Sequence, residues 1–119
     1  QIATTAFVRA AGGFSAYFQS GPQGVPTGAD TVAVAHGLGG TPIMVDAYLV
    51  CDSDDAGYAA GDVVRLPGVK ANAAYTLSAN SSEVFLATSG DFEVINRTSP
   101  GGYNGINSSS WSLYLRAWA

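Results

Sequence analysis

The chain has 119 residues and a mass of 12.1 kDa, which suits one compact domain. Its hydrophobic share of 47%, with only 12% charged residues, excludes intrinsic disorder. The net charge of −4 argues against nucleic acid as a partner, because phosphate backbones are bound by basic surfaces. No run of 18 apolar residues occurs, so we expect no membrane insertion. The first residues lack both an initiator Met and a signal-peptide layout, which predicts a fragment or a processed chain.

Glycine and proline divide the chain into short runs rich in β-branched and aromatic residues, which predicts an all-β fold. We expect an N-terminal arm and a Gly/Pro-rich connection over residues 1–29, followed by a β-sandwich domain over residues 30–119. Such short strands with frequent turns are typical of an antiparallel β-sandwich, here of six to seven strands. In chain order, the predicted strands are 5–9, 14–19, 31–36, 43–51, 62–66, 75–79, 83–88, 92–96 and 111–118.

Two of these runs predict a contact on the second face of their strand. In the run 43–51 one face carries Asp46, and the largely apolar character of both faces predicts a central strand whose Asp46 face meets another element or another chain. The outward face of the last run bears Tyr114, Arg116 and Trp118, which a lone sandwich would leave in water. We expect these three residues to form an oligomer interface. The alternative is that the N-terminal arm covers them.

The residues give no support for catalysis. A Ser-His-Asp triad would need His36, the single histidine, close to a serine on a strained turn, and no G-x-S-x-G motif occurs. No spacing of carboxylates singles out an acid/base pair, and no glycine cluster matches a phosphate-binding loop. We therefore expect neither an enzyme nor a cofactor. For His36 we favour a structural role in the turn that it opens over a contact to a sugar.

An acidic turn offers a weak candidate for a metal site. Asp52, Asp54 and Asp55 could bind Ca²⁺ through carboxylate oxygens. The turn departs from the EF-hand pattern, because its twelfth position is Val63 instead of Glu. Aspartates in turns also hydrogen-bond their own backbone, so we favour a solvated turn and predict no metal site.

Loop aromatics give the main candidates for a binding site. The loop over residues 98–110 is long, and loops of this length are usually functional or disordered. Aromatic rings beside Asn side chains suit a saccharide, because the ring stacks on C–H groups while the amide binds hydroxyls. Alternatively, Trp111 belongs to the core and the tyrosines pack on neighbouring loops. The candidate saccharide contacts are Tyr58, Tyr103, Asn104, Asn107 and Trp111. Three Asn-X-Ser/Thr triplets, at Asn80, Asn96 and Asn107, match glycosylation acceptors, but chance also supplies such triplets in a chain rich in Asn and Ser.

Several motifs resemble tailed-phage fibre and tail-tip proteins. The His-Gly-Leu-Gly turn of residues 36–42 leads into a strand ending at Val50 and Cys51, and a Gly-Tyr-x-x-Gly-Asp turn follows at 57–62. The closing run 111–119 is similar to the last strand of H-type lectin-like sandwiches. The resemblance implies a lectin-like antiparallel sandwich that assembles as a homotrimer and is displayed on a virion. It carries over no binding residue.

From the residues and the resemblance together, we expect a phage fibre or tail-tip domain that recognises a host-surface saccharide. Its partners would be two further copies of the chain, other virion proteins and a glycan on the host cell. The alternative is a purely structural virion protein, such as a head decoration or a fibre-attachment module, without a ligand. A cellular H-type lectin is a third interpretation, which the phage-like middle motif disfavours.

Overall fold

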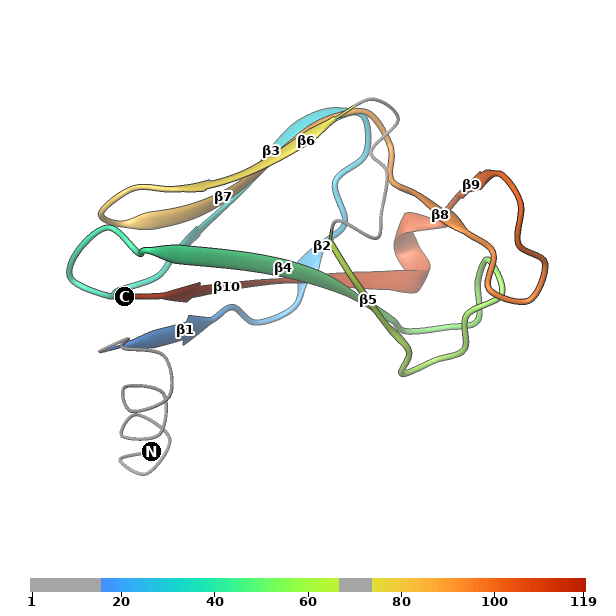
Figure 1. Cartoon of the computed structure of the whole chain (residues 1–119), viewed down its shortest axis with the longest axis horizontal. Helices are drawn as coiled ribbons and strands as arrows, with labels where there is room; N and C mark the ends of the chain where they lie inside the picture. The colour runs from blue at the N-terminus through green and yellow to red at the C-terminus, as the bar shows by residue number, and fades with distance from the viewer. Residues whose placement is uncertain (1–15, 67–73) are drawn as a thin grey trace.

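The computed structural model describes residues 16–66 and 74–119, and in these residues every strand pairing is antiparallel. The predicted all-β class is confirmed, and two sheets packed as layers are consistent with a β-sandwich (Figure 1). The strands are β1 (Tyr17–Gln19), β2 (Gln23–Gly24), β3 (Ala29–Ala35), β4 (Met44–Cys51), β5 (Val63–Arg65), β6 (Tyr75–Ala79), β7 (Glu83–Ser89), β8 (Glu93–Ile95), β9 (Tyr103–Gly105) and β10 (Trp111–Trp118). One 3₁₀ turn, η1 (Ser108–Ser110), leads into β10.

The first sheet has the strand order β1-β10-β4-β5, and β2 also pairs with β10. Its centre is the pair β10 and β4, which are aligned over their full lengths from Trp111 opposite Cys51 to Trp118 opposite Met44. β4 is therefore a central strand, as its two apolar faces predict. β1 closes one edge, where the backbones of Ala16 and Ala119 exchange two hydrogen bonds of 2.9 and 3.0 Å.

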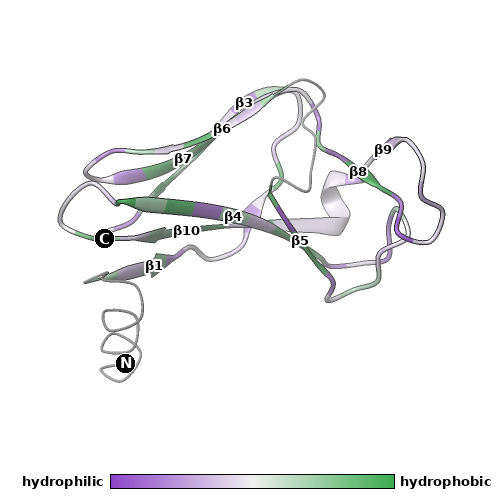
Figure 2. Ribbon diagram, viewed as in Figure 1, coloured by the Kyte–Doolittle hydropathy of each residue, from purple (hydrophilic) through white to green (hydrophobic). Residues whose placement is uncertain are grey.

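The second sheet has the order β3-β7-β6, with β7 in the middle. A separate hairpin of β8 and β9 lies at one end of the molecule, beyond the end of β7 (Figure 1). Figure 2 shows that the loops around this hairpin are largely hydrophilic or neutral, whereas β4 and β7 carry apolar stretches. The molecule thus has a polar loop end next to its packed strands.

The core forms where alternate residues of the two sheets face each other. Leu113 and Leu115 of β10, Leu49 of β4, and Val84 and Leu86 of β7 are fully buried. Their spacing of two residues follows from the strand geometry, in which successive side chains point to opposite faces. The remaining buried apolar residues are Ala47, Cys51, Leu66, Phe92, Val94, Trp111 and Ala117.

Sequence and structure differ at several boundaries. The arm expected over residues 1–29 contains β1 and β2, which belong to the first sheet because both hydrogen-bond to β10. Part of the expected arm thus joins the first sheet through β1 and β2. The loop predicted over 98–110 contains β9 and η1, which raises the strand number above the expected six to seven. The predicted strand 5–9 lies outside the described residues.

Candidate functional site

Asp55 brings three of the predicted saccharide residues together. Its Oδ2 atom accepts hydrogen bonds from the backbone N–H of Asn107 at 2.8 Å and from the indole N–H of Trp111 at 2.9 Å. The ring of Tyr58 meets the indole of Trp111 edge to face, with the ring centroids 5.6 Å apart. Residues separated by more than 50 positions thus meet beside the β8–β9 hairpin.

Both aromatic rings of this cluster pack within the fold, with Trp111 buried and Tyr58 half-buried. Trp111 is only 3% exposed and belongs to the core, so its expected role as a stacking platform is wrong. The hydroxyl of Tyr58 donates to the carbonyl of Ile95 at 2.9 Å, and the guanidinium of Arg97 lies 5.0 Å from the Tyr58 ring centroid. The alternative, that these rings pack within the fold, describes both residues.

Tyr103 and Asn104 occupy a different position, in strand β9 of the hairpin. Both lie in β9, where Tyr103 is paired with Ile95 and Asn104 with Val94. Tyr103 is 52% exposed, and Asn104 is exposed as well. These two side chains are placed where a ligand could contact them from solution.

The acidic turn is built around hydrogen bonds. Asp52 accepts from the hydroxyl of Ser112 at 2.6 Å, and Asp54 accepts from the N–H of Ala60 at 3.1 Å. Asp55 is engaged by Asn107 and Trp111, so the three carboxylates serve separate partners. Within residues 16–66 and 74–119, no cluster of three His, Cys, Asp or Glu side chains is arranged to hold a metal ion.

The three Asn-X-Ser/Thr triplets share one structural role. Asn80 Oδ1 accepts from the backbone of Ser82 and Glu83, and Asn96 Oδ1 accepts from the backbone of Thr98 and Ser99. Asn107 Oδ1 likewise accepts from the N–H and the hydroxyl of Ser109, which caps η1. Each triplet therefore closes a turn by a side-chain hydrogen bond to its own backbone, which is what Asn favours in such positions.

His36 has the structural role that the sequence favours. The residue is 5% exposed, its Nδ1 accepts from the N–H of Leu38 at 3.0 Å, and its Nε2 lies 2.9 Å from the carbonyl of Asn80. Since Nδ1 accepts a hydrogen bond, the ring proton lies on Nε2, whose N–H donates a hydrogen bond to that carbonyl. Both ring nitrogens are thus used to join the turn after β3 to the turn before β7.

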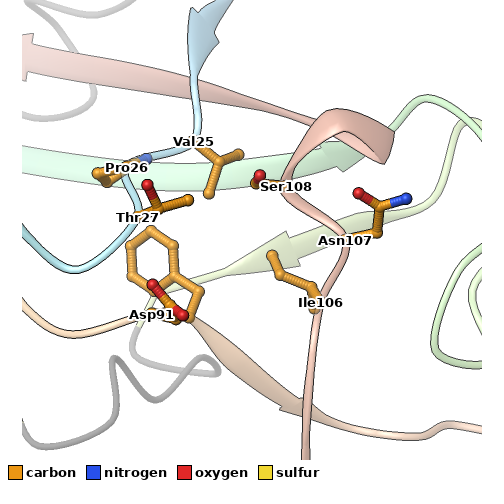
Figure 3. A pocket seen from close by; sticks show the side chains of 8 residues that line it. Val25, Pro26, Thr27, Asp91, Ile106, Asn107 and Ser108 are labelled. Atoms are coloured by element: carbon orange, nitrogen blue, oxygen red, sulfur yellow. The ribbon is translucent and has the colours of Figure 1, made fainter.

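A hollow of about 230 Å³ lies at the base of the β8–β9 hairpin, and the sequence does not point to it. Three separate segments form its walls: the chain after β2, the residues before β8, and the residues between β9 and β10. In Figure 3, Thr27 and Asp91 lie on one side of the hollow, and Ile106 and Ser108 lie on the other. The lining residues are Val25, Pro26, Thr27, Asp91, Phe92, Ile106, Asn107 and Ser108.

Hydrogen bonds between distant segments hold these walls in place. Asp91 Oδ1 accepts from the N–H of Gly28 at 2.5 Å, and the carbonyl of Gly28 accepts from the hydroxyl of Thr88 at 2.8 Å. Gly28 has a φ of 68°, a conformation that glycine adopts without steric cost. On the opposite wall, the N–H of Ile106 donates to the carbonyl of Phe92 at 3.4 Å. The hollow is therefore preformed by the fold.

The second candidate surface is the outer aromatic face of the first sheet, formed by Tyr17, Tyr48, Tyr114, Arg116 and Trp118. Tyr48 and Tyr114 stack with centroids 5.1 Å apart, and Tyr17 lies 5.3 Å from Trp118. The guanidinium of Arg116 lies 4.9 Å from the Tyr48 ring centroid and 5.4 Å from that of Trp118. Tyr17 joins this surface from the edge strand β1, which pairs with β10, and the residue is 40% exposed.

Asp46 supports this face from the adjacent strand. Its carboxylate forms ion pairs with Arg116 and, at 3.1 Å, with Arg65. Burial by itself raises the pKa of Asp46, but the hydrogen bonds from Arg116 and Arg65 outweigh this effect and hold the pKa below its ordinary value. Side chains of the neighbouring strands β10 and β5 in the same sheet thus hold Asp46, and coverage of its face by another chain stays a prediction.

Exposed apolar side chains lie at both ends of the outer aromatic face. Met44 is 46% exposed and Val63 is 57% exposed, at opposite ends of the face. Large exposed apolar patches on a protein mark contact surfaces for other molecules.

Among the described residues, no helix has the length and apolar character needed to cross a membrane. Comparisons with protein-family models, with curated proteins and with solved structures find no match to this chain.

Proposed function

We propose that this chain is a virion domain of a tailed phage, from a fibre or a tail tip, that trimerises and recognises a saccharide on the host cell. The proposed location is the surface of the extracellular particle. The motifs at residues 36–42 and 57–62 support a phage origin by resemblance. The proposal includes no catalytic step and no cofactor.

One observation carries the proposal: the molecule has two unlike surfaces in different places. The outer aromatic face lies on β10 and β4 and is suited to contact between copies of the chain. The hairpin end instead presents polar loops, an exposed Tyr103 and a preformed hollow. A fibre domain needs both surfaces, because trimeric presentation strengthens weak single sites through high effective concentration.

A glycan array probed with the labelled full chain tests the recognition of a saccharide. We expect the wild-type chain to bind at least one glycan, and we expect Tyr103→Ala to weaken that binding, because the exposed ring is lost. Thr76→Ala, which changes an exposed residue of β6 on the other sheet, is the matched control and keeps the binding. Failure of the wild-type chain to bind any glycan would contradict the proposed recognition.

The alternative is a structural virion module, such as a head decoration or a fibre-attachment protein, without a ligand. It is favoured by the packing of Tyr58 and Trp111, because Trp111 is buried and the half-buried Tyr58 ring contacts both Trp111 and Arg97. A chain that forms trimers but binds no glycan would support this alternative.

A further inference from the structure

We propose that the hollow at the base of the β8–β9 hairpin binds one neutral sugar ring. This inference rests on the proposed function, since it assigns the saccharide to a specific site and to a chemical class. The site differs from the residues that the sequence suggests: of those residues, only Asn107 lines the hollow.

The size of the hollow limits the ligand. At about 230 Å³ it is smaller than the ~300–1,000 Å³ of clefts for drug-sized molecules. A single ring therefore fits it better than an extended oligosaccharide, whose further units would lie outside. Thr27 and Asn107 line the hollow and are exposed, so further units of a longer glycan could continue toward solution beside them.

The lining has the mixed character that a sugar requires. Val25 and Ile106, which are half-buried, offer apolar surface on which the C–H groups of a ring can pack. Pro26 and Phe92 are buried, so this part of the lining has a fixed shape. Clefts that combine apolar walls with a few placed polar groups are typical of small-molecule sites.

Three polar side chains that line the hollow can form further hydrogen bonds. Oδ1 of Asp91 accepts the hydrogen bond from the N–H of Gly28, and Oδ2 can accept another from a ligand. The hydroxyls of Thr27 and Ser108 make no hydrogen bond within the described part of the chain. A carboxylate oxygen and two hydroxyls, each able to pair with a ligand hydroxyl, suit a ligand with several adjacent hydroxyl groups.

Charge decides between neutral and acidic sugars. Asp91 places a carboxylate at the hollow, none of the lining side chains is basic, and the whole chain carries a net charge of −4. A uronic or sialic acid would bring a second carboxylate close to Asp91 without a cation to compensate it. The site therefore selects a neutral ring.

Titration of the ¹⁵N-labelled full chain with methyl glycosides of glucose, galactose and mannose tests the inference. Each glycoside is compared with its uronic acid counterpart. We expect at least one neutral glycoside to shift the amide signals of Gly28 and Ile106, which are hydrogen-bonded to Asp91 and Phe92. The corresponding uronic acid should leave these two signals unchanged at the same concentration.

Two substitutions, Asp91→Asn and Ser108→Ala, test which side chains of the hollow bind the sugar. The Asn variant keeps the carbonyl oxygen for Gly28, and we expect it to weaken binding by about tenfold or more, because a hydrogen bond to a charged group is worth about one decade or more in affinity. Asp30→Asn removes an exposed carboxylate outside the hollow and is the matched control, with unchanged affinity.

The outcomes separate this inference from the proposed function. Binding of a neutral sugar that shifts other amides, or that survives both Asp91→Asn and Ser108→Ala, would overturn the hollow as the site and leave saccharide recognition intact. Equal binding of the uronic acids would overturn the selection for a neutral ring. A chain that binds no glycoside in the titration and no glycan on an array would overturn both proposals.

Discussion

Asp46 is a single side chain on which the outer aromatic face depends. Its residue is only 7% exposed, yet it accepts from both Arg116 and Arg65. The guanidinium of Arg116, held by this carboxylate, lies between the rings of Tyr48 and Trp118. One carboxylate therefore positions a cation that in turn contacts two rings of the face.

Asp46→Asn tests this dependence through stability. We expect a loss of about 1–3 kcal/mol in the free energy of unfolding at pH 7, because the buried carboxylate loses its charge while Arg65 and Arg116 remain partly exposed to water. Because the pKa of Asp46 is lowered in the folded state, its stabilising effect is present at neutral pH and is lost as the pH falls below the ordinary Asp value of about 4.

Urea unfolding of wild type and variant between pH 7 and pH 2 measures the effect. The two unfolding free energies should differ most at neutral pH and approach each other in acid, where the wild-type carboxyl is protonated. Asp30→Asn, at an exposed position, should leave the unfolding free energy within about 0.5 kcal/mol of wild type. A constant difference between Asp46→Asn and wild type at all pH values would contradict the lowered pKa.

Gly57 is a second residue of interest, because a single added Cβ atom there would lower the stability of the fold. Its φ is 83°, and a Cβ there would lie 2.8 Å from Asn96 Cγ and 3.0 Å from Thr98 Oγ1. We expect Gly57→Ala to cost about 1–3 kcal/mol of stability from backbone strain, with the displacement of Asn96 added. Gly61→Ala, at a φ of 94° with open space around it, carries the backbone strain alone. Thermal unfolding of both variants separates the two effects, and equal losses would contradict the clash.

At the scale of elements, Asp55 joins the turn after β4 to the segment that leads from β9 into β10. We expect Asp55→Ala to destabilise the chain by about 1–3 kcal/mol, because the buried indole N–H of Trp111 loses its acceptor. In a Trp118→Phe background, Trp111 is the one remaining tryptophan, and its fluorescence should shift to longer wavelength as water enters. Asp54→Ala, which removes a single backbone contact of an exposed side chain, should leave the spectrum unchanged.

The elements differ in how far local sequence predicts them. The bounds predicted for β6 and β10 agree with the structure, because alternation over five to eight residues defines both strands. β2 and β9 were missed, since they have two and three residues and consist largely of Gly, Gln and Asn. Such segments become strands only because a neighbouring strand supplies their hydrogen bonds.

At the scale of the whole molecule, the outer aromatic face predicts self-association. We expect the purified wild-type chain to have a mass of three times 12.1 kDa by light scattering. Tyr114→Lys should yield a monomer, because it brings a charge into the centre of the face. Ser78→Lys, at an exposed position of β6 on the other sheet, should keep the trimer. A monomeric wild-type chain, or a trimeric Tyr114→Lys variant with unchanged circular dichroism, would contradict the predicted interface.

The whole-molecule arrangement also explains why two surfaces can act independently. Trp118 and Tyr17 lie at one end of β10, whereas the hairpin lies beyond its other end, at Trp111 (Figure 1). Contacts between copies at the outer aromatic face would therefore leave the hollow open. Tyr114→Lys and Asp91→Asn should accordingly affect different measurements, oligomeric mass and sugar affinity.

The sequence by itself determined the class of the fold, most strand positions and the structural role of His36, because these follow from local alternation and turn chemistry. It also placed Tyr114, Arg116 and Trp118 together on one face, since a strand's period of two is a local property. Only the tertiary structure decided which face of β10 is covered: the strand's period puts Trp111 and Trp118 on opposite faces, and packing in the fold buries Trp111 and places its indole N–H next to the acceptor on Asp55. The hollow is the clearest case, because its walls come from residues 25–27, 91–92 and 106–108, which no local pattern connects. Their meeting depends on long-range pairing and packing, which only the folded chain provides.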